Sequence, residues 1–501
     1  MDVIINVENC YLLLLLALIV SIPACLFFLV RLREAIHSSR RLPPSAYAWQ
    51  VVCNMSMSPL GSLANLAQIY GPIFSLRVGA LLIIVASSPK TAMEILKARY
   101  HMFSGRYIPS LYYRIPRMEQ SSVLGAKECN DGWKYMRAMC HNWLLSVKAI
   151  KLRNEVRERK MMELADYLHA KEGEIVTIRD VVFATLANSM GNMMVSRDLI
   201  DLERECKSGN QSLMGFIGAM LTVLGSPSLV DLFPILNGLL GFWERRKAKK
   251  LHQEFKSLWE EVIEERRQAK CTGEEPSQDL LDALIDNGFC NDKICALLME
   301  MLVAGTFISC STIEWLMVEL IKNQGVLHKL RNEIENTGDG DIKNASSRHM
   351  PYLKACLKET LRLHPPKLFV LPRRALETCT VNNYVIPKDS VILINIWALG
   401  RDPMTWDEPL KFKPKRFLES QLELKGNVQF EFIPFGGGRR MCPGFNVATT
   451  HIQGIVALLV HCFDWFLPEG INPDNLNMTE KFGTTVYMKE PLSLIPRSRI
   501  P

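Results

Sequence analysis

The sequence contains no Cys-x-x-Cys pair, although 14 cysteines are scattered through its 501 residues. The absence of a Cys-x-x-Cys motif argues against a zinc site and against a compact disulfide framework. All but one of the cysteines are therefore predicted to be reduced, buried packing residues. Reduced cysteines are typical of a protein whose main body faces the cytosol.

The sequence also lacks a long basic tract, and its net charge is only +7, from 59 Lys and Arg against 52 Asp and Glu. Nucleic acid is therefore not a predicted partner. A mild positive charge fits an anionic membrane surface or an acidic protein partner better. Apolar residues make up 48% and charged residues 22% of the chain, which is typical of a globular protein.

Charged residues are missing from one long stretch, Tyr11 to Val30. As a helix it would be about 30 Å long, which is the thickness of a bilayer core. Arginines follow the stretch and acids precede it, so the positive-inside rule places the rest of the chain in the cytosol. These residues are Arg31, Arg33, Arg40 and Arg41 after it, and Asp2 and Glu8 before it. The prediction is an uncleaved signal anchor that crosses the endoplasmic reticulum membrane once, with a cleaved signal peptide as the alternative.

The most informative stretch surrounds Cys442, which follows a glycine-rich loop with two arginines: FGGGRRMCPG, residues 435–444. Glycine allows a tight loop and close approach by a flat ligand. Loop N–H groups and the start of a following helix, expected over Phe445–Phe463, are predicted to lower the thiol pKa. A thiolate held in this way suits an iron atom. A buried structural cysteine in a glycine-rich turn is the alternative.

The loop matches the pattern Phe-x-x-Gly-x-Arg-x-Cys-x-Gly and resembles the haem-binding loop of the cytochrome P450 family. Its fixed positions are Phe435, Gly438, Arg440, Cys442 and Gly444. The resemblance implies a mainly α-helical P450 fold with small β-sheets behind an N-terminal transmembrane anchor. It also implies haem b, iron protoporphyrin IX, with Cys442 as the axial thiolate.

Under this interpretation the chain has three parts. Residues 1–30 are the signal anchor, and residues 31–50 are a basic, proline-containing hinge. Residues 51–501 are the haem-thiolate catalytic domain. Within the hinge, Leu42-Pro43-Pro44 is a stiff spacer that can hold the catalytic domain off the membrane.

The residues that contact the haem propionates are assigned by resemblance to three places in the sequence. Trp133 and Arg137 are four residues apart and share one helix face. Arg373 belongs to Leu371-Pro372-Arg373-Arg374, and Arg440 precedes the cysteine by two residues. Arginine suits this role because its contact with a carboxylate is charge-assisted and can be bidentate.

A second set of residues is assigned by resemblance to a structural network. Glu359 and Arg362 lie three residues apart on a helix face, and Arg416 belongs to Pro414-Lys415-Arg416-Phe417. Lys415 stands where the family normally has an acid. The resemblance implies that the three residues form a buried network that supports the cysteine side of the haem site. A surface pair of Glu359 and Arg362 is the alternative.

A long helix is predicted over Asn291–Lys322, and it resembles the oxygen-binding helix of the family through Ala304 and Gly305. The family normally continues with an acid and a threonine, whereas this chain has Phe307 and Ile308. Neither side chain can hold or donate a proton. Proton delivery is general-acid work, so Ser309 and Thr312 are the candidate substitutes that could organise a water.

Three interpretations of this departure stay open. The enzyme hydroxylates its substrate with a rerouted proton relay, or it oxidises without inserting oxygen, by phenol coupling, ring closure or desaturation. Alternatively, it isomerises or dehydrates a substrate without activating oxygen. A haem sensor or carrier without catalysis is the competing class.

Several further elements are predicted. Ile73–Ala86 should form two strands with a turn at Gly79, and Ser88-Pro89 should begin a helix. Phe103–Gly125 is expected to be a long, functional loop. Met214–Trp243 should form two short helices that cap the pocket and dip into the membrane, with ordinary core helices as the alternative. A basic run, Arg245–Lys250, follows.

By resemblance, the substrate pocket includes the stretch Lys367–Val370 and the last loop, Lys481–Val486. The residues assigned to its lining are Phe307, Ile308, Phe369, Val370, Thr484 and Thr485. The neighbourhoods of the motifs are similar to plant microsomal enzymes of specialised metabolism, and Leu371–Lys388 is most similar to alkaloid and terpenoid hydroxylases. The implied substrate is small and lipophilic, and the implied electron source is NADPH through NADPH-cytochrome P450 reductase.

Overall fold

The computed structural model describes residues 42–46, 59–208, 212–225, 227–336, 349–425, 429–483 and 485–499. The predicted anchor, residues 1–30, and most of the hinge lie outside the described residues. The end of the hinge joins the fold, because Ser45–Ala46 (β1) pairs in parallel with Ile73–Val78 (β2). The Ser75 hydroxyl also donates a hydrogen bond to the Pro43 carbonyl, at 3.0 Å.

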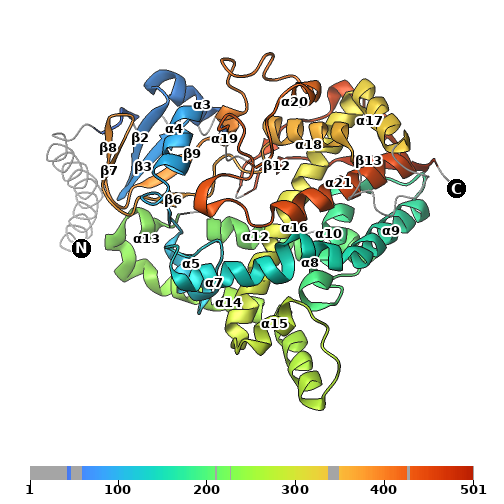
Figure 1. The fold of residues 1–501 in the computed structure, drawn as a ribbon, viewed down its shortest axis with the longest axis horizontal. Helices are drawn as coiled ribbons and strands as arrows, with labels where there is room; N and C mark the ends of the chain where they lie inside the picture. The colour runs from blue at the N-terminus through green and yellow to red at the C-terminus, as the bar shows by residue number, and fades with distance from the viewer. Residues whose placement is uncertain are drawn as a thin grey trace, which may run out of the picture.

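A single helix, α16 (Asn291–Lys322), forms the axis of the helical part of the molecule (Figure 1). It packs against α10 (Ile178–Val195), α14 (Asn237–Thr272), α18 (Pro351–Leu363) and α21 (Phe445–Cys462). Most of its residues are buried, because apolar side chains occur all round the helix rather than on one stripe. The predicted bounds of this helix are confirmed.

The remaining helices cover this core and link it to the sheets. They are α3 (Pro59–Tyr70), α4 (Pro89–Met93), α5 (Ser110–Arg114), α6 (Met118–Ser121), α7 (Asp131–Cys140), α8 (Val147–Leu152), α9 (Asn154–Ala170), α11 (Leu202–Ser208), α12 (Leu213–Gly225), α13 (Leu229–Leu232), α15 (Leu280–Asp286), α17 (Gln324–Asn336), α19 (Ile396–Leu399) and α20 (Lys415–Leu418).

The β structure is gathered mainly in a six-stranded sheet at one side of the molecule, next to α3 and α4 (Figure 1). Its strand order is β1-β2-β3-β9-β6-β4, with β3 (Leu81–Ala86), β4 (Gly105–Arg106), β6 (Arg373–Arg374) and β9 (Val391–Ile394). A three-stranded sheet contains β10 (Phe463–Phe466), β13 (Ser493–Ser498) and β5 (Val176–Thr177). Two hairpins complete the set, β7 (Cys379–Val381) with β8 (Tyr384–Ile386), and β11 (Glu480–Lys481) with β12 (Tyr487–Met488).

The predicted hairpin is confirmed, because β2 and β3 pair antiparallel from Ile73–Ala86 to Val78–Leu81. Gly79 in its turn has a φ of +57°. A Cβ there would also lie 2.2 Å from the carbonyl oxygen of Leu232, so α13 packs on this turn. The predicted helix start is confirmed as well, because the Ser88 side chain caps α4 and Pro89 is its first residue.

Two predictions of local structure need correction. The expected loop Phe103–Gly125 contains β4, α5 and α6, because its residues pair and pack with segments distant in sequence. The apolar region Met214–Trp243 contains α12 and α13, but its last part begins the 36-residue helix α14 instead of ending a short one. The basic run Arg245–Lys250 lies on α14 and continues the same helix.

Two described helices, α16 and α21, have the length and apolar composition to cross a membrane. Both are largely buried within the fold, which is the usual reason for a core helix to pass this test. The expectation that the cysteines are buried holds for most of those described, but Cys271 and Cys290 are exposed and correct it. No disulfide joins the cysteines of the described part of the chain.

Candidate active site

A cavity of about 1310 Å³, counting its open mouth, lies between the Cys442 loop and α16. One wall is formed by the loop before α21, including Phe435, Gly436 and Cys442. The opposite wall is formed by one face of α16. Because small-molecule pockets commonly hold about 300–1,000 Å³, this space is large enough for a flat cofactor and a substrate together.

The Cys442 loop is held by its own backbone. The Cys442 N–H donates a hydrogen bond to the Phe435 carbonyl at 3.0 Å. Gly438 has a φ of +67°, and a Cβ there would lie 2.3 Å from the Leu96 carbonyl oxygen. A Cβ on Gly444 would meet only the Cys442 sulfur, at 4.0 Å. The glycines therefore permit both the tight turn and an open space beside the sulfur.

The pKa of the Cys442 thiol differs from the expectation for the loop alone. Burial raises this pKa above its ordinary value, and the Gly444 N–H and Arg137 only act against that rise. The predicted lowering by a loop N–H is present, through Gly444, but burial outweighs it, so the expectation of a lowered thiol pKa is corrected for the protein without metal. A metal ion removes the proton of a coordinating thiol outright, so ligation itself would supply the thiolate.

Four arginines gather near the same end of the cavity, and Arg106, Arg137 and Arg440 line it directly. Burial and mutual repulsion lower the pKa of Arg106 well below its ordinary value, and Arg373 contributes most of that repulsion, followed by Arg440. None of the four forms an ion pair with a carboxylate of the described residues. Buried charges are normally paired, so this cluster indicates a missing anionic partner.

The hydrogen bonds of the cluster lead to the same conclusion. Arg440 donates to the carbonyls of Ser104 and Ala126, at 2.9 and 2.8 Å, but its Nη1 has no partner in the described chain. Arg373 donates to the Gly437 carbonyl at 2.7 Å, while its Nε has none. A thiol beside apolar walls and a group of incompletely paired guanidinium groups fit a flat iron porphyrin with two carboxylates.

The predicted propionate residues are brought together, though not all reach the cavity surface. Arg137 donates to the Met441 carbonyl at 2.7 Å and lies over the Trp133 ring, as Arg440 also does. The Trp133 indole N–H donates to the Val123 carbonyl at 2.8 Å, and neither Trp133 nor Arg373 is among the lining residues.

Arg106 was missed by the sequence reasoning. It lies on β4, which pairs with β6, so that Arg106 stands opposite Arg373. Its guanidinium group donates to the Leu371 carbonyl at 2.6 Å and to the Leu124 carbonyl at 3.1 Å. No local pattern marks this residue, because its partner strand lies far along the chain.

A second missed residue is Glu300, one turn before Ala304 on α16. Its carboxylate accepts hydrogen bonds from the N–H groups of Val123 and Leu124, at 2.9 and 2.6 Å, and from the Ser122 hydroxyl at 2.7 Å. Burial raises the pKa of Glu300 above its ordinary value. This residue fixes the loop that carries the carbonyl acceptors of Trp133 and Arg106. A charged residue inside an apolar helical pattern was its only sequence signal.

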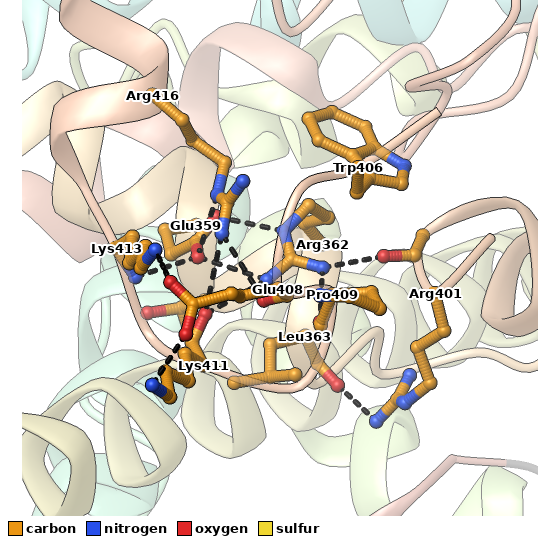
Figure 2. Close-up of polar contacts among 12 residues, drawn as sticks. Glu359, Arg362, Leu363, Arg401, Trp406, Glu408, Pro409, Lys411, Lys413 and Arg416 are labelled. Atoms are coloured by element: carbon orange, nitrogen blue, oxygen red, sulfur yellow. Dashed lines mark hydrogen bonds and ion pairs between the residues drawn. The ribbon is translucent and has the colours of Figure 1, made fainter. Parts of the chain in front are cut away.

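The predicted network lies behind the cysteine wall, and Figure 2 shows the Glu359 carboxylate between two guanidinium groups. Arg362 contacts Glu359 through two hydrogen bonds of 2.8 and 2.9 Å, and Arg416 through one of 3.1 Å. The Lys413 N–H adds a fourth, at 2.7 Å. Glu359 and Arg362 are buried, so the surface-pair alternative is wrong.

This network ties α18 to the chain that leads towards the cysteine loop. Arg362 also donates to the carbonyls of Pro409 and Lys411, at 2.7 and 3.2 Å, and lies over the Trp406 ring (Figure 2). Fully paired buried charges of this kind fix one arrangement of the backbone, because every alternative leaves a charge unpaired.

The α16 wall of the cavity consists of one helix face. Its lining residues are Met301, Ala304, Gly305, Ile308, Ser309 and Thr312. A Cβ on Gly305 would lie 2.8 Å from the end of the Met190 side chain, so this glycine lets α10 pack closely. Phe307 does not line the cavity, because its ring packs edge-on against Phe183, with the centroids 5.4 Å apart. The expectation for Phe307 is thereby corrected, and the helical spacing of the lining residues could have revealed it.

The two hydroxyl groups on this wall differ. The Thr312 hydroxyl donates to the Ile308 carbonyl within the helix, at 2.8 Å. The Ser309 side chain is buried against the cavity, and no hydrogen bond joins its hydroxyl to another described residue. Ser309 is therefore the freer of the two groups for a water or a substrate.

The remaining pocket predictions have mixed outcomes. Phe369 and Val370 line the cavity, together with Lys367. Thr485 is buried outside the lining, with its hydroxyl unpaired in the described chain. Thr484 lies outside the described residues.

The comparisons with known proteins agree with this geometry. The model of the family described as Cytochrome P450 matches residues 43–493. A relative named probable (S)-N-methylcoclaurine 3'-hydroxylase isozyme 2, from Coptis japonica, is 44% identical over 96% of this chain and 98% of its own length. Corytuberine synthase, also from Coptis japonica, is 37% identical over 97% of this chain and 99% of its own length.

Solved structures show the same fold. A zebra fish cytochrome P450 determined with progesterone superposes with a TM-score of 0.72 at 21% identity, and covers 87% of this chain and 99% of its own. The family match, the relatives above 30% identity and the cysteine loop facing α16 lead to one conclusion. This chain is an enzyme of the cytochrome P450 family, a group of monooxygenases and related oxidoreductases.

Proposed function

We propose that this protein is a membrane-anchored, haem-thiolate P450 that oxidises a small lipophilic plant specialised metabolite, an alkaloid, terpenoid or phenolic compound. It would use O2 and electrons that NADPH-cytochrome P450 reductase takes from NADPH. The observation that carries the proposal is the cavity, in which Cys442 on one wall faces Ala304, Gly305 and Ile308 on the other. Relatives named for alkaloid conversions support the substrate range.

The residues have separate tasks in this proposal. Cys442 would ligate the iron, and Arg106, Arg137, Arg373 and Arg440 would hold the two propionates. When bound, the haem supplies oxygen activation, with the thiolate donating electron density that favours cleavage of the O–O bond. The chain supplies a dry, apolar space, in which Phe369 and Val370 position the substrate and Ser309 and Thr312 hold a water for proton delivery.

The surface around α13 supports the membrane location. Large apolar side chains are exposed there, on α13, the turn after it and the start of α14: Leu229, Phe233, Ile235, Leu239, Phe242 and Trp243. Exposed basic residues follow in Arg245–Lys250. An apolar patch next to cations is suited to an anionic membrane surface. We therefore propose a single-pass protein of the endoplasmic reticulum, with residues 1–30 as anchor, 31–50 as hinge and a cytosolic catalytic domain.

A second function is favoured by Ile308, which occupies the cavity wall where the family normally has a threonine. Without that hydroxyl, the site is suited to oxidation without oxygen insertion, such as coupling or ring closure of a phenol. Two relatives are named as synthases, corytuberine synthase and berbamunine synthase, the latter from Berberis stolonifera and 36% identical. Both functions consume O2 and NADPH.

Turnover of the full-length protein with reductase, NADPH and labelled O2 separates the alternatives. Label in the product supports hydroxylation, and NADPH consumption with unlabelled product supports oxidation without insertion. Conversion without NADPH would support isomerisation instead. A haem-loaded protein that converts none of a panel of alkaloids, terpenoids and phenols would contradict the proposal.

A further inference from the structure

A buried group of ionisable side chains has no task in the function proposed above. Its centre is His364, the residue that ends α18. The other members of this His364 group are Glu319 on α16, Glu480 on β11 and Arg401 after α19. At most 11% of each side chain is exposed, and none of the four lines the described cavity. Buried charges are costly unless they are paired, so their contacts indicate what the group does.

His364 joins two elements through its imidazole ring. Its Nε2 lies 2.7 Å from Oε1 of Glu319, and its Nδ1 lies 3.5 Å from Oε1 of Glu480. The ring also stacks on the indole of Trp315, with the centroids 4.1 Å apart and the planes within 2° of parallel. Because both nitrogens face carboxylates, the ring can donate hydrogen bonds to both only as an imidazolium. His364 thereby connects α16 to the β11–β12 hairpin.

The chain that follows His364 forms a wall of the cavity. Most of residues 366–371 belong to the cavity lining. The Pro366 carbonyl accepts a hydrogen bond from the Val486 N–H at 2.9 Å, next to β12. The Val486 carbonyl in turn accepts one from the Ser311 hydroxyl of α16, at 2.7 Å. The hairpin and α16 therefore hold the start of this wall at two points, at His364 and at Pro366.

Unlike the Glu359 network, the His364 group leaves polar atoms without hydrogen bonds. Nδ1 of His364, Oε1 of Glu480 and Nη1 of Arg401 have none within the described chain. Arg401 donates to the Leu363 carbonyl instead, next to His364, and lies 3.6 Å from Glu480 (Figure 2 shows Arg401 with Leu363). Unpaired buried polar atoms cost free energy, so the group contributes less to stability than its number of charges suggests. Its contacts serve instead to join three elements around the wall.

We propose that His364 is a positioning residue which, through Glu319 and Glu480, holds residues 366–371 close to α16 and so sets the width of the substrate side of the cavity. The inference rests on the proposed function, because it takes the space between this wall and α16 as the place of the substrate. A ligand that fills this space contacts both sides and loses contacts when the wall moves away. A ligand that reaches only the iron does not depend on this width.

Titration of the full-length, haem-loaded protein with two iron-ligating triazoles tests the inference. Methyltriazole occupies little more than the iron, whereas benzyltriazole also places a ring between α16 and residues 366–371. The shift of the Soret band measures the binding of each, and the ratio of the two dissociation constants isolates the substrate side. In the wild type we expect benzyltriazole to bind more tightly, because its ring is buried between largely apolar surfaces.

Matched variants assign this preference to the His364 group. His364→Phe keeps a ring that can stack on Trp315 but removes both nitrogens. The preference for benzyltriazole should then fall by about 10-fold, the scale of one lost hydrogen bond to a charged group, while the affinity for methyltriazole stays unchanged. Glu480→Gln should lower the preference by less, and should add little to His364→Phe because both act through one contact. His328→Phe, at an exposed position of α17, is the control and should change nothing.

A purely structural role would lower stability and haem content but leave the ratio unchanged among the molecules that carry haem. That result would overturn the inference, as would an equal loss of affinity for both triazoles, no preference in the wild type, or the same change in His328→Phe. If His364→Phe yields no haem-loaded protein, Glu480→Gln provides the comparison, and an unchanged ratio there contradicts the inference. Because these measurements need no turnover, absent oxidation with reductase and NADPH would contradict the proposed function alone.

Discussion

The two walls of the cavity differ in how strongly their polar groups are fixed. Behind the Cys442 wall, Glu359 accepts four hydrogen bonds and Arg362 donates to carbonyl groups as well. On the α16 wall, side chains are apolar apart from two hydroxyls, and only Thr312 has a hydrogen bond within the described chain. The polar groups behind the first wall are held by several hydrogen bonds each, while on the second wall Ser309 is left available.

This difference indicates a division of labour. A cofactor that stays bound requires groups held in one geometry by their neighbours. A wall that meets changing substrates and waters needs free donors and apolar surface instead. Changes behind the cysteine should therefore affect stability and haem retention, whereas changes on α16 should affect how NADPH consumption is coupled to product.

The largest effect should follow from Glu359→Gln. This change leaves Arg362 buried without its carboxylate, and breaking a buried pair typically costs ~3–5 kcal/mol. We expect a matching loss in the free energy of unfolding by urea, together with poor haem retention. The control is Glu174→Gln, which removes an exposed ion pair with Lys171 and should leave both measurements unchanged. If Glu359→Gln were as stable as the wild type, the network behind the Cys442 wall would have no special role in stability, and the two walls would not differ in this respect.

The next effect concerns the arginine cluster. In Arg106→Met one cation near the propionates is lost, and the haem should dissociate about 10- to 100-fold faster, as measured by transfer to a haem scavenger. The protein without haem should not lose stability in proportion, because repulsion among the arginines is relieved. Arg374→Met is the control, since Arg374 pairs with Asp389 at 2.6 Å on the surface. Equal haem loss in both variants would contradict the assigned role.

Much of the cysteine side could be predicted from the sequence, because its motifs are local. Cys442, Arg440 and the glycines lie within one loop, and Glu359 and Arg362 lie on one helix turn. Arg106 could not be predicted in this way. Its role depends on β4 pairing with β6, which joins segments far apart in the chain.

The sequence predicts less well which side chains of α16 face the cavity, because that depends on how the helix packs in the fold. The extent of α16 followed from its long apolar pattern, but the direction of Phe307 required its spacing from the other lining residues. Ile308 lies on the cavity face, whereas Phe307 points to α10 and contacts Phe183. The pKa of Cys442 was misjudged because burial, a property of the whole fold, outweighs the local loop.

A moderate effect is expected for the free hydroxyl on α16. Because Ser309 has no partner in the described chain, Ser309→Ala should remove a water site and increase the peroxide released per NADPH. General acid–base groups typically contribute 10²–10⁴-fold, so product formation should fall by at least about 10-fold. Thr312→Val should have a smaller effect, because the Thr312 hydroxyl already donates to Ile308. A larger effect of Thr312→Val than of Ser309→Ala would show that the hydrogen-bonded hydroxyl of Thr312 is the functional one.

The smallest effect concerns the family's missing threonine. Ile308→Thr adds a hydroxyl to the cavity face and should lower the peroxide released per NADPH by a few-fold, since general acid groups assist proton delivery. Phe307→Asp serves as the contrast. It places a carboxylate against Phe183, away from the cavity, so it should lower thermal stability rather than improve coupling. Unchanged peroxide release in Ile308→Thr would contradict the importance of this position.

The most direct test of the account is the absorbance spectrum of the reduced protein under carbon monoxide, compared between wild type and Cys442→Ser. The account predicts the red-shifted Soret band of thiolate-ligated haem in the wild type, and its loss in the variant. A wild-type protein that takes up no haem, or a variant that keeps the thiolate band, would contradict the assignment of Cys442 as the iron ligand.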